Sequence, residues 1–370
     1  MADSRVAEHD LLYVLLLIPG LGRRRIRAIF EAYGSFSTAF EEWGFLVEQF
    51  KLQAVWSKFG KNQDPFALAY GLAQKRKAEG FSYMCFLDAD FPEQLRNIPD
   101  PPLALFCRGD ASLLHEQLAI GVVGSRKPTS YGRAVCARLT GELAEAGVTI
   151  VSGLAYGIDR EAHEAALKAG GRTIGVMGCG IDHIYPAGNR QLYRQMEESA
   201  LLISEYPPGT PAVPGLFPER NRIISGLSLG VLVVEAAERS GSLITADCAL
   251  EQGKDVYAVP GSIFSEMSAG PHNLLKQGAK LVTTGREVLE EWEYLMGEEK
   301  GDYNIEETRK VSMSDAEVAV YSLITEEGIH ADELLGSLES GQRPMLHQTL
   351  LLLEGKGLIA SLPGGFFARR

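Results

Sequence analysis

Short apolar segments alternate with amphipathic helical segments between Leu118 and Trp292. Several apolar segments are rich in valine and isoleucine without polar alternation, which is typical of strands buried on both faces of a parallel sheet. The predicted strands are Leu118–Gly124, Val148–Ser152, Thr173–Met177, Leu201–Ser204, Val231–Glu235, Val256–Val259 and Ala279–Val282. Helices are predicted between most of them, including Tyr131–Gly147, Arg160–Ala169, Arg190–Ser199 and Leu243–Gln252. This alternation predicts an α/β fold with a doubly wound, mostly parallel sheet.

Glycine and polar residues gather where these strands end. Ligands of such sheets bind at the carboxyl ends of the strands, so these clusters predict one binding edge. The clusters are Gly124-Ser125-Arg126, Ser152-Gly153 with the residues up to Gly157, Gly178-Cys179-Gly180, Glu205 to Pro208, Glu235, Ser240-Gly241-Ser242 and Pro260-Gly261-Ser262.

The turn at Gly124-Ser125-Arg126 lies between a predicted strand and a predicted helix. Backbone N–H groups at such a junction can face an anion, and the arginine adds a bidentate donor for phosphate. The spacing matches neither a Walker loop nor G-x-G-x-x-G. Taken alone, the stretch therefore fits a phosphate site and an ordinary tight turn with a solvated arginine equally well.

Residues 1–78 are predicted to form a small helical domain, of the helix-hairpin-helix or SAM-like type. The turn after its first helix carries Gly20 and Gly22, followed by Arg23 and Arg24. In a helix-hairpin-helix the glycines let the backbone approach a phosphate while nearby cations hold the strand. The pattern occurs once, so a short interhelical turn with a solvated basic helix start stays an alternative.

Composition narrows the classes of function. The net charge of −12 argues against nonspecific coating of nucleic acid, so a nucleic-acid site has to be local. The chain has no uncharged apolar run of about 18 residues, and no membrane partner is expected. Its five cysteines are scattered without a C-x-x-C pair, which favours free thiols in the cytoplasm.

The charged stretch 293–311 is predicted to be a linker that follows a central domain of residues 79–292. Residues 312–370 are predicted to form three helices, Asp315–Leu323, Ala331–Gly336 and Pro344–Lys356, and a hairpin that turns at Pro363-Gly364-Gly365, an order that resembles a winged helix. Its third helix offers little to a DNA groove beyond His347, Gln348 and Lys356, and acidic residues outnumber basic ones. We therefore expect a protein-interaction module, with DNA contact as the lesser alternative.

Five motifs in the central domain resemble the bacterial DNA-processing protein A family, also called Smf. They are GSRKPTSYG, VSGLAYGID, GCGIDHIYPAGN, SEYPPGTPAVPGLFPERNRIISGLS and VVEAAERSGSLITADCALEQGKDVYAVPG, and the likeness covers roughly Phe81–Val282. The resemblance implies an extended Rossmann-like domain that binds and protects incoming single-stranded DNA. It also implies a homodimer that helps to load the RecA recombinase during natural transformation, without catalysis or cofactor.

The resemblance assigns roles to individual residues. Arg126 is similar to the arginine that holds the DNA backbone, and Phe217 stands where the family places an aromatic that stacks on a base. Phe217 could instead fill the core, and Lys254 could be a solvated surface lysine. Pro214 stands where some relatives have a lysine. The full set of expected DNA contacts is Gly124, Ser125, Arg126, Ser152, Gly153, Phe217, Arg220, Asn221, Arg222, Gly241, Ser242, Thr245 and Lys254, with Gly20, Gly22, Arg23 and Arg24 as a possible secondary contact.

The main alternative is a nucleotide-binding enzyme of the nucleoside-phosphate hydrolase type, because Rossmann-like sheets also serve such enzymes. Six groups could act as acids or bases: Asp159, His163, Asp182, His183, Glu205 and Glu235. They form no convincing catalytic set, and Asp182-His183 lacks a third ligand at metal spacing. The sequence therefore predicts neither catalytic residues nor a metal site.

Overall fold

The computed structural model describes residues 7–59, 64, 66–68, 70–72, 80–292, 314–325, 328–338, 343–355, 358–362 and 365–369. The chain divides into two compact units, Met1–Gly297 and Glu298–Arg370. The predicted linker 293–311 and the end of the predicted first domain, 73–78, lie outside the described residues, as do Lys356, Pro363 and Gly364.

The first unit is built on one sheet with the strand order β1-β2-β6-β5-β4-β3-β7-β8-β9. All neighbours from β6 to β9 in this order are parallel, whereas β1 and β2 add an antiparallel edge. The predicted mostly parallel α/β sheet is thereby confirmed. The strands are β1 (Ser82–Cys85), β2 (Ala104–Gly109), β3 (Ala119–Val123), β4 (Thr149–Ser152), β5 (Thr173–Met177), β6 (Leu201–Ser204), β7 (Gly230–Val233), β8 (Asp255–Ala258) and β9 (Lys280–Leu281).

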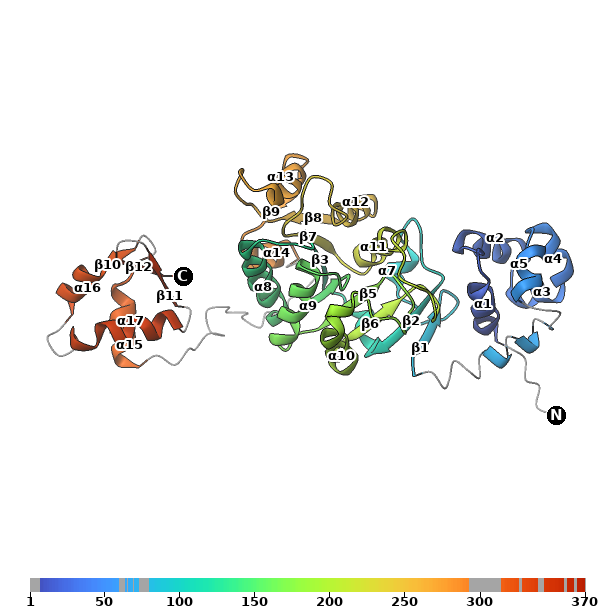
Figure 1. Cartoon of the computed structure of the whole chain (residues 1–370), viewed down its shortest axis with the longest axis horizontal. Coiled ribbons are helices and arrows are strands. Elements are labelled where there is room, and N and C mark those ends of the chain that lie inside the picture. Colours follow the sequence, from blue (N-terminus) through green and yellow to red (C-terminus); the bar gives the residue numbers. More distant parts are fainter. Residues whose placement is uncertain are drawn as a thin grey trace. The chain divides into compact units, whose positions relative to one another are not determined.

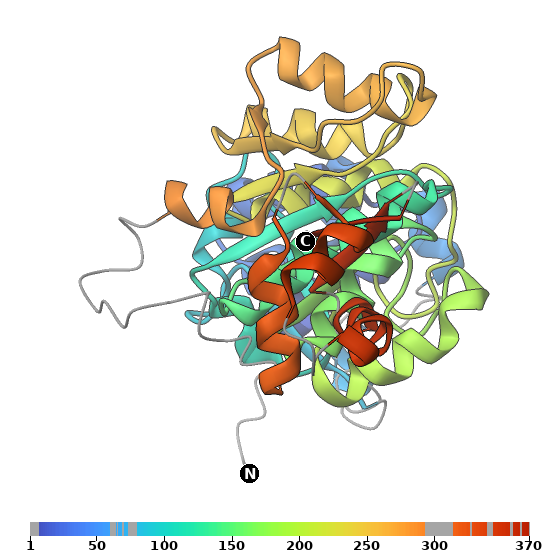
Figure 2. The same ribbon diagram turned by 90° about the vertical axis from the view of Figure 1, so that its left-hand side faces the viewer.

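Helices cover both faces of this sheet (Figures 1 and 2). One face packs against α11 (Leu216–Gly226), α12 (Leu243–Glu251) and α13 (Ala269–Lys276), with the short α7 (Glu93–Arg96) beneath α11. The other face packs against α8 (Ser130–Glu145), α9 (Ile158–Lys168) and α14 (Gly285–Glu291), and α10 (Arg190–Ser199) covers β2 and β6. Strand side chains such as Val122 and Val123 are buried on opposite faces, which explains the absence of polar alternation.

The N-terminal helices of the first unit share a core with the antiparallel edge of the sheet. They are α1 (Glu8–Leu17), α2 (Arg23–Tyr33), α3 (Phe36–Glu41), α4 (Trp43–Gln49) and α5 (Gln53–Phe59). Gly20, which has a φ of 79°, lies in the turn between α1 and α2, and Gly22 caps α2. The left-handed backbone at Gly20 is the reason why glycine suits this turn.

The second unit has its own core and a three-stranded sheet in the order β10-β12-β11. Its elements are α15 (Asp315–Leu323), β10 (Ile329–His330), α16 (Ala331–Ser337), α17 (Leu346–Gly355), β11 (Ile359–Leu362) and β12 (Phe366–Arg369). All strand pairs in this sheet are antiparallel. Ser314 begins α15 with a capping box that includes Glu317, which fixes the start of the unit's first helix.

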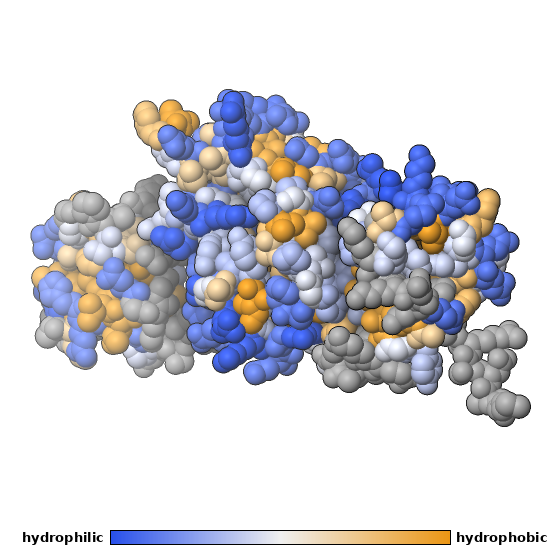
Figure 3. Space-filling view, turned by 45° about the vertical axis from the view of Figure 1, so that its right-hand side comes forward, coloured by the Kyte–Doolittle hydropathy of each residue, from blue (hydrophilic) through white to orange (hydrophobic). Residues whose placement is uncertain are grey.

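Figure 3 shows small apolar clusters separated by polar side chains on the face of the molecule in view. The most exposed large apolar side chains are Ile263 and Phe264, in the loop after β8. Within the part of the chain that the structure describes, no helix has the length and apolarity needed to cross a membrane.

Candidate functional site

A groove with a cavity volume of about 710 Å³ lies at the carboxyl ends of the parallel strands. It is bounded by the loop after β3, the start of α11 and the start of α12. Nine of the thirteen main residues expected to contact DNA line it: Gly124, Ser125, Arg126, Phe217, Arg220, Asn221, Gly241, Ser242 and Thr245. The topology thus brings together residues from three distant stretches of sequence, as expected for a binding edge of this type of sheet.

The loop after β3 is held by Glu235, and this corrects one expectation. The Ser125 N–H, predicted to face a phosphate, donates instead to the Glu235 carbonyl at 2.6 Å. The Glu235 carboxylate accepts from the Thr129 N–H at 2.8 Å and the Thr129 hydroxyl at 2.6 Å. A carboxylate therefore already occupies the positive start of α8, which leaves the exposed side chains of Arg126 and Lys127 as donors of this turn.

Arg126 lies beside two aromatic rings. Its guanidinium carbon is 5.9 Å from the centre of the Phe217 ring, and the Phe217 and Tyr185 ring centres are 5.2 Å apart at an interplanar angle of 38°. Phe217 is only partly buried, and its ring lies over Gly178, where a Cβ would be 2.6 Å from Phe217 Cδ1. The alternative that Phe217 fills the core is therefore wrong. A cation beside an accessible ring suits a phosphate and its attached base.

Helix α11 carries Phe217, Arg220 and Asn221 into the groove. Arg220 is 4% exposed and donates from Nη1 to the Val176 carbonyl. Its Nε has no hydrogen-bond partner among the described residues, and burial lowers its pKa. Gly153 accommodates this side chain, since a Cβ there would lie 2.0 Å from Arg220 Nη1. Gly153, expected to contact DNA, does not line the main groove; its lack of a side chain leaves room for the buried guanidinium.

The start of α12 forms the opposite wall. Asn221 Nδ2 donates to the Gly241 carbonyl at 3.3 Å, and the Ser240 and Ser242 hydroxyl oxygens are 2.7 Å apart. The N–H of Thr245, one of the expected DNA contacts, is taken within the helix start, since it donates to the Ser242 carbonyl at 3.1 Å. The helix dipole still favours negative charge at this wall.

Ser152 and Lys254, two other expected contacts, have their functional groups away from the groove. The Ser152 hydroxyl is buried and donates to the Val122 carbonyl at 2.6 Å. Lys254 Nζ donates to the Ser225 and Gly226 carbonyls at the end of α11, each at 2.6 Å, and burial lowers its pKa to about 8. Lys254 therefore neither lines the groove nor is a solvated surface lysine, because its ammonium group caps the end of α11.

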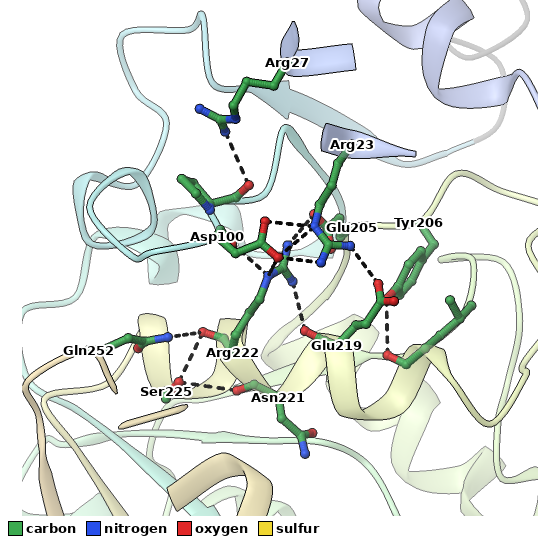
Figure 4. Close-up of polar contacts among 12 residues, drawn as sticks. Arg23, Arg27, Asp100, Glu205, Tyr206, Glu219, Asn221, Arg222, Ser225 and Gln252 are labelled. Carbon is green, nitrogen blue, oxygen red and sulfur yellow. Dashed lines mark hydrogen bonds and ion pairs between the residues drawn. The ribbon is translucent and has the colours of Figure 1, made fainter. Parts of the chain in front are cut away.

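Arg222 belongs to a network of ion pairs behind α11 (Figure 4). Its Nη2 donates to Glu205 Oε1 at 2.6 Å, and both side chains are buried. Its Nε donates to the Asp100 carbonyl at 2.8 Å. This corrects the expectation that Arg222 contacts DNA, because its charge is already satisfied by a buried carboxylate.

Arg23 joins the same network from α2. Its Nε is 3.0 Å from both Asp100 carboxylate oxygens, and its Nη1 is 2.7 Å from Glu219 Oε2. These contacts raise the pKa of Arg23, and together with Arg222 they hold the pKa of Asp100 below its usual value despite its partial burial. Arg23 is thus committed to carboxylates rather than open to a phosphate. Gly20, Gly22 and Arg24 are exposed, and none of them lines the groove.

Of the six candidate acids and bases, only Asp159 lines the groove. Burial raises its pKa, although the nearby Arg220 acts in the opposite direction. His163 is fully buried, and its Nδ1 lies 2.7 Å from the Thr173 hydroxyl, which itself donates to the Ile150 carbonyl. The Nδ1 therefore carries the proton, and burial lowers the pKa of His163 to about 3.

The other candidates also have structural partners. Glu205 pairs with Arg222 and Glu235 binds Thr129, as described above, while Asp182 accepts from the Gly209 N–H at 2.9 Å and pairs with His183. Within the described ranges, no group of three or more histidine, cysteine or acidic side chains could hold a metal ion.

Sequence reasoning placed Tyr156 in one of the strand-end clusters but singled out neither Tyr156 nor Tyr185 as a contact residue. Tyr185 lines the groove, and both tyrosines line a smaller hollow of about 30 Å³ that shares Arg126, Ala155, Tyr185 and Phe217 with the groove. Each is a single aromatic in a loop, without a periodic pattern. Their positions at two strand ends were the only signal available.

Comparison with known proteins gives these observations a family context. Residues 82–293 match the family model described as DNA recombination-mediator protein A. The chain is 49% identical over 215 residues to DNA processing protein DprA of Bacillus subtilis (strain 168). The matched region is 58% of this chain and 72% of that protein.

Solved structures of this family also match the chain. The structure of DNA processing protein A from Streptococcus pneumoniae is 38% identical, has a TM-score of 0.65 and covers 76% of this chain and 97% of that one. A structure from Helicobacter pylori, described for the unique single-stranded DNA binding mode of its DNA processing protein A, is 31% identical, with a TM-score of 0.53 and coverage of 58% and 96%. The resemblance inferred from the motifs is thereby confirmed, and the chain belongs to the DNA recombination-mediator protein A family.

Proposed function

We propose that this protein binds single-stranded DNA in the groove at the carboxyl ends of its parallel strands. The observation that carries the proposal is the placement of the exposed Arg126 beside the accessible Phe217 ring, in a groove closed on its far side by the start of α12. The structure of the Helicobacter pylori relative, which concerns single-stranded DNA binding, supports the same assignment.

Each part of the groove suits a part of the strand. Arg126 donates to a phosphate, with the exposed Lys127 beside it, and a base stacks on Phe217. Every base has a π-face, so this mode tolerates any sequence. The protein's net charge of −12 argues against nonspecific coating of DNA, so binding has to rest on local sites such as this one.

The wider role that we propose is recombination mediation during natural transformation, in the cytoplasm. The protein would protect the incoming strand and help to load RecA onto it, as a homodimer that presents two grooves, without catalytic turnover. The three helices and the small sheet of the second unit support a winged helix, which we assign to protein contact. The turn between α1 and α2 supports a helix-hairpin-helix with Gly20, Gly22 and Arg24 as a secondary DNA contact.

Fluorescence anisotropy with labelled oligo-dT and a matched duplex, at low and moderate salt, tests the binding proposal. We expect salt-sensitive preference for the single strand, and weaker binding in Arg126→Ala and Phe217→Ala. Arg138→Ala is the matched control, because Arg138 is an exposed arginine of α8 that pairs with Glu142 and does not line the groove. Weak binding that none of these variants changes would overturn the proposal.

A further inference from the structure

Two exposed tyrosines continue the line of the groove beyond Arg126. Tyr185 is 43% exposed and Tyr156 is 46% exposed. Both line the small hollow that also includes Arg126 and Phe217, so the aromatic surface does not end at Phe217. Together with Arg126 and Phe217 the two rings form one continuous exposed surface, and a continuous surface of this kind is typical of a ligand-binding site.

The loops that carry these rings are tied together. Asn189, which is buried, donates from Nδ2 to the Leu154 carbonyl at 2.9 Å and to the Ala155 carbonyl at 3.3 Å. This links the loop before Tyr156 to the loop after Tyr185. Leu154 has a φ of 58°, a left-handed backbone that is costly for leucine and that the surrounding contacts maintain.

The loop of Tyr185 and the side chain of Tyr156 each have a fixed support. The Tyr193 hydroxyl donates to the Tyr185 carbonyl at 2.8 Å, which anchors that loop to α10. Tyr156 lies against Gly188, where a Cβ would be 2.8 Å from the Tyr156 oxygen. A base that meets these rings therefore meets side chains whose backbones are already ordered, which reduces the entropy lost on binding.

From this geometry we propose that Tyr156 and Tyr185 are base-stacking residues that extend the Phe217 platform past Arg126. The ligand is the run of nucleobases adjacent to the phosphate at Arg126. The inference rests on the proposed single-stranded DNA binding. It adds the path of the strand over the surface, from the start of α12 across Arg126 to Tyr156. The continuity of the hollow with the groove and the cationic charge of Arg126 between them favour this occupant.

The test compares two oligonucleotides of equal length, oligo-dT and a strand in which every base is replaced by an abasic tetrahydrofuran unit. Both have the same phosphates, so the ratio of their affinities isolates the contribution of the bases. In Tyr185→Ala and Tyr156→Ala we expect the affinity for oligo-dT to fall about fivefold or more, which is the equivalent of at least about 1 kcal/mol per stacked base. The affinity for the abasic strand should stay the same.

Control variants separate stacking from folding and from charge. Tyr185→Phe and Tyr156→Phe keep the ring and should bind like the wild type. Tyr131→Ala removes a tyrosine that is 49% exposed but lines neither cavity, so it should leave the ratio unchanged. Arg126→Ala should weaken binding of both strands, because it removes a phosphate contact.

The possible failures are distinguishable. If Arg126→Ala lowers the affinity for both strands but neither tyrosine variant changes the ratio, the stacking inference is overturned and the binding proposal stands. If no variant changes either affinity, both are overturned. A loss of binding to the abasic strand in the tyrosine variants would also overturn the inference, because it would mean that the rings support the fold and not the bases.

Discussion

The two sides of α11 use arginine in opposite ways. On the groove side, no carboxylate makes a direct ion pair with Arg126 or Arg220 among the described residues, and Arg126 is exposed. Behind the helix, Arg222 and Arg23 each contact carboxylates at 3.0 Å or less. The same kind of side chain thus supplies an available positive charge on one side and an internal cross-link on the other.

This difference shows that the partner, and not the residue type, decides what an arginine can do. A guanidinium whose donors are already taken by Glu205 or Asp100 cannot bind a phosphate without leaving a carboxylate unpaired. Helix α11 is therefore fixed by ion pairs on one side and faces the open groove on the other. The comparison predicts loss of stability from one set of variants and loss of binding from the other.

The largest effect is expected from Arg222→Ala. Removal of this side chain leaves the buried Glu205 without its ion-pair partner, and breaking such a pair costs about 3–5 kcal/mol. Urea unfolding of the full chain measures this change. In the double variant Arg222→Ala with Glu205→Gln the loss should be smaller; equal losses in the single and double variants would contradict the role of the pair.

Arg126→Ala should have the opposite profile. Loss of a hydrogen bond to a charged group corresponds to about 1.5–3 kcal/mol, so oligo-dT should bind about ten- to a hundredfold more weakly. The slope of log affinity against log salt should shrink by about 0.7 for the lost phosphate contact. Unfolding in urea should stay within about 0.5 kcal/mol of the wild type. A large loss of unfolding free energy in Arg126→Ala would contradict the proposed difference between Arg126 and Arg222.

His163, in α9 on the opposite face of the sheet from α11, tests the buried polar groups of the core. Its pKa is about 3 in the folded protein against 6.5 for an ordinary histidine, so below pH 6.5 the unfolded chain takes up a proton that the folded chain does not. Stability should therefore fall as the pH falls from 6.5 towards 3, by about 1.4 kcal/mol per pH unit, or about 2 kcal/mol at pH 5. Urea unfolding at pH 7 and pH 5 should show this extra loss in the wild type and not in His163→Asn.

The smallest effect is expected from Arg23→Ala. Its partners Asp100 and Glu219 are partly exposed, and such pairs contribute about 0.2–1 kcal/mol each. Thermal unfolding at low and high salt should show a small loss that salt reduces. DNA affinity should not change, and a drop comparable with that of Arg126→Ala would restore Arg23 as a DNA contact.

Much of this architecture could be predicted from sequence because it depends on local patterns. Buried strands such as Ala119–Val123 need apolar residues on both faces, and the glycine turns mark where they end. The antiparallel edge formed by β1 and β2, and the strand order, depend on pairing between distant segments. A local pattern contains no information about such pairing.

The errors in the site have a related cause. Arg222 and Lys254 look like free cations in the sequence because their partners, Glu205 and the end of α11, are brought to them only by folding. The Ser125 amide was predicted to be available for the same reason, since Glu235 takes it from a neighbouring strand end. Arg126 was predicted from its place in the turn after a strand and Phe217 through the family resemblance, and their roles in binding stay predictions.

The hydrogen bonds between the Glu235 carboxylate and Thr129 at the start of α8 restrict which residues fit at position 132. A Cβ on Gly132 would lie 2.2 Å from Glu235 Oε2, so a larger residue at 132 is incompatible with the carboxylate where it now stands. The two positions should therefore change together among relatives: lineages that replace Gly132 should also have shortened or lost the acid at 235. A variant that replaces Gly132 while Glu235 is still present would have a steric clash. The acid at 235 should therefore change before, or together with, the glycine at 132.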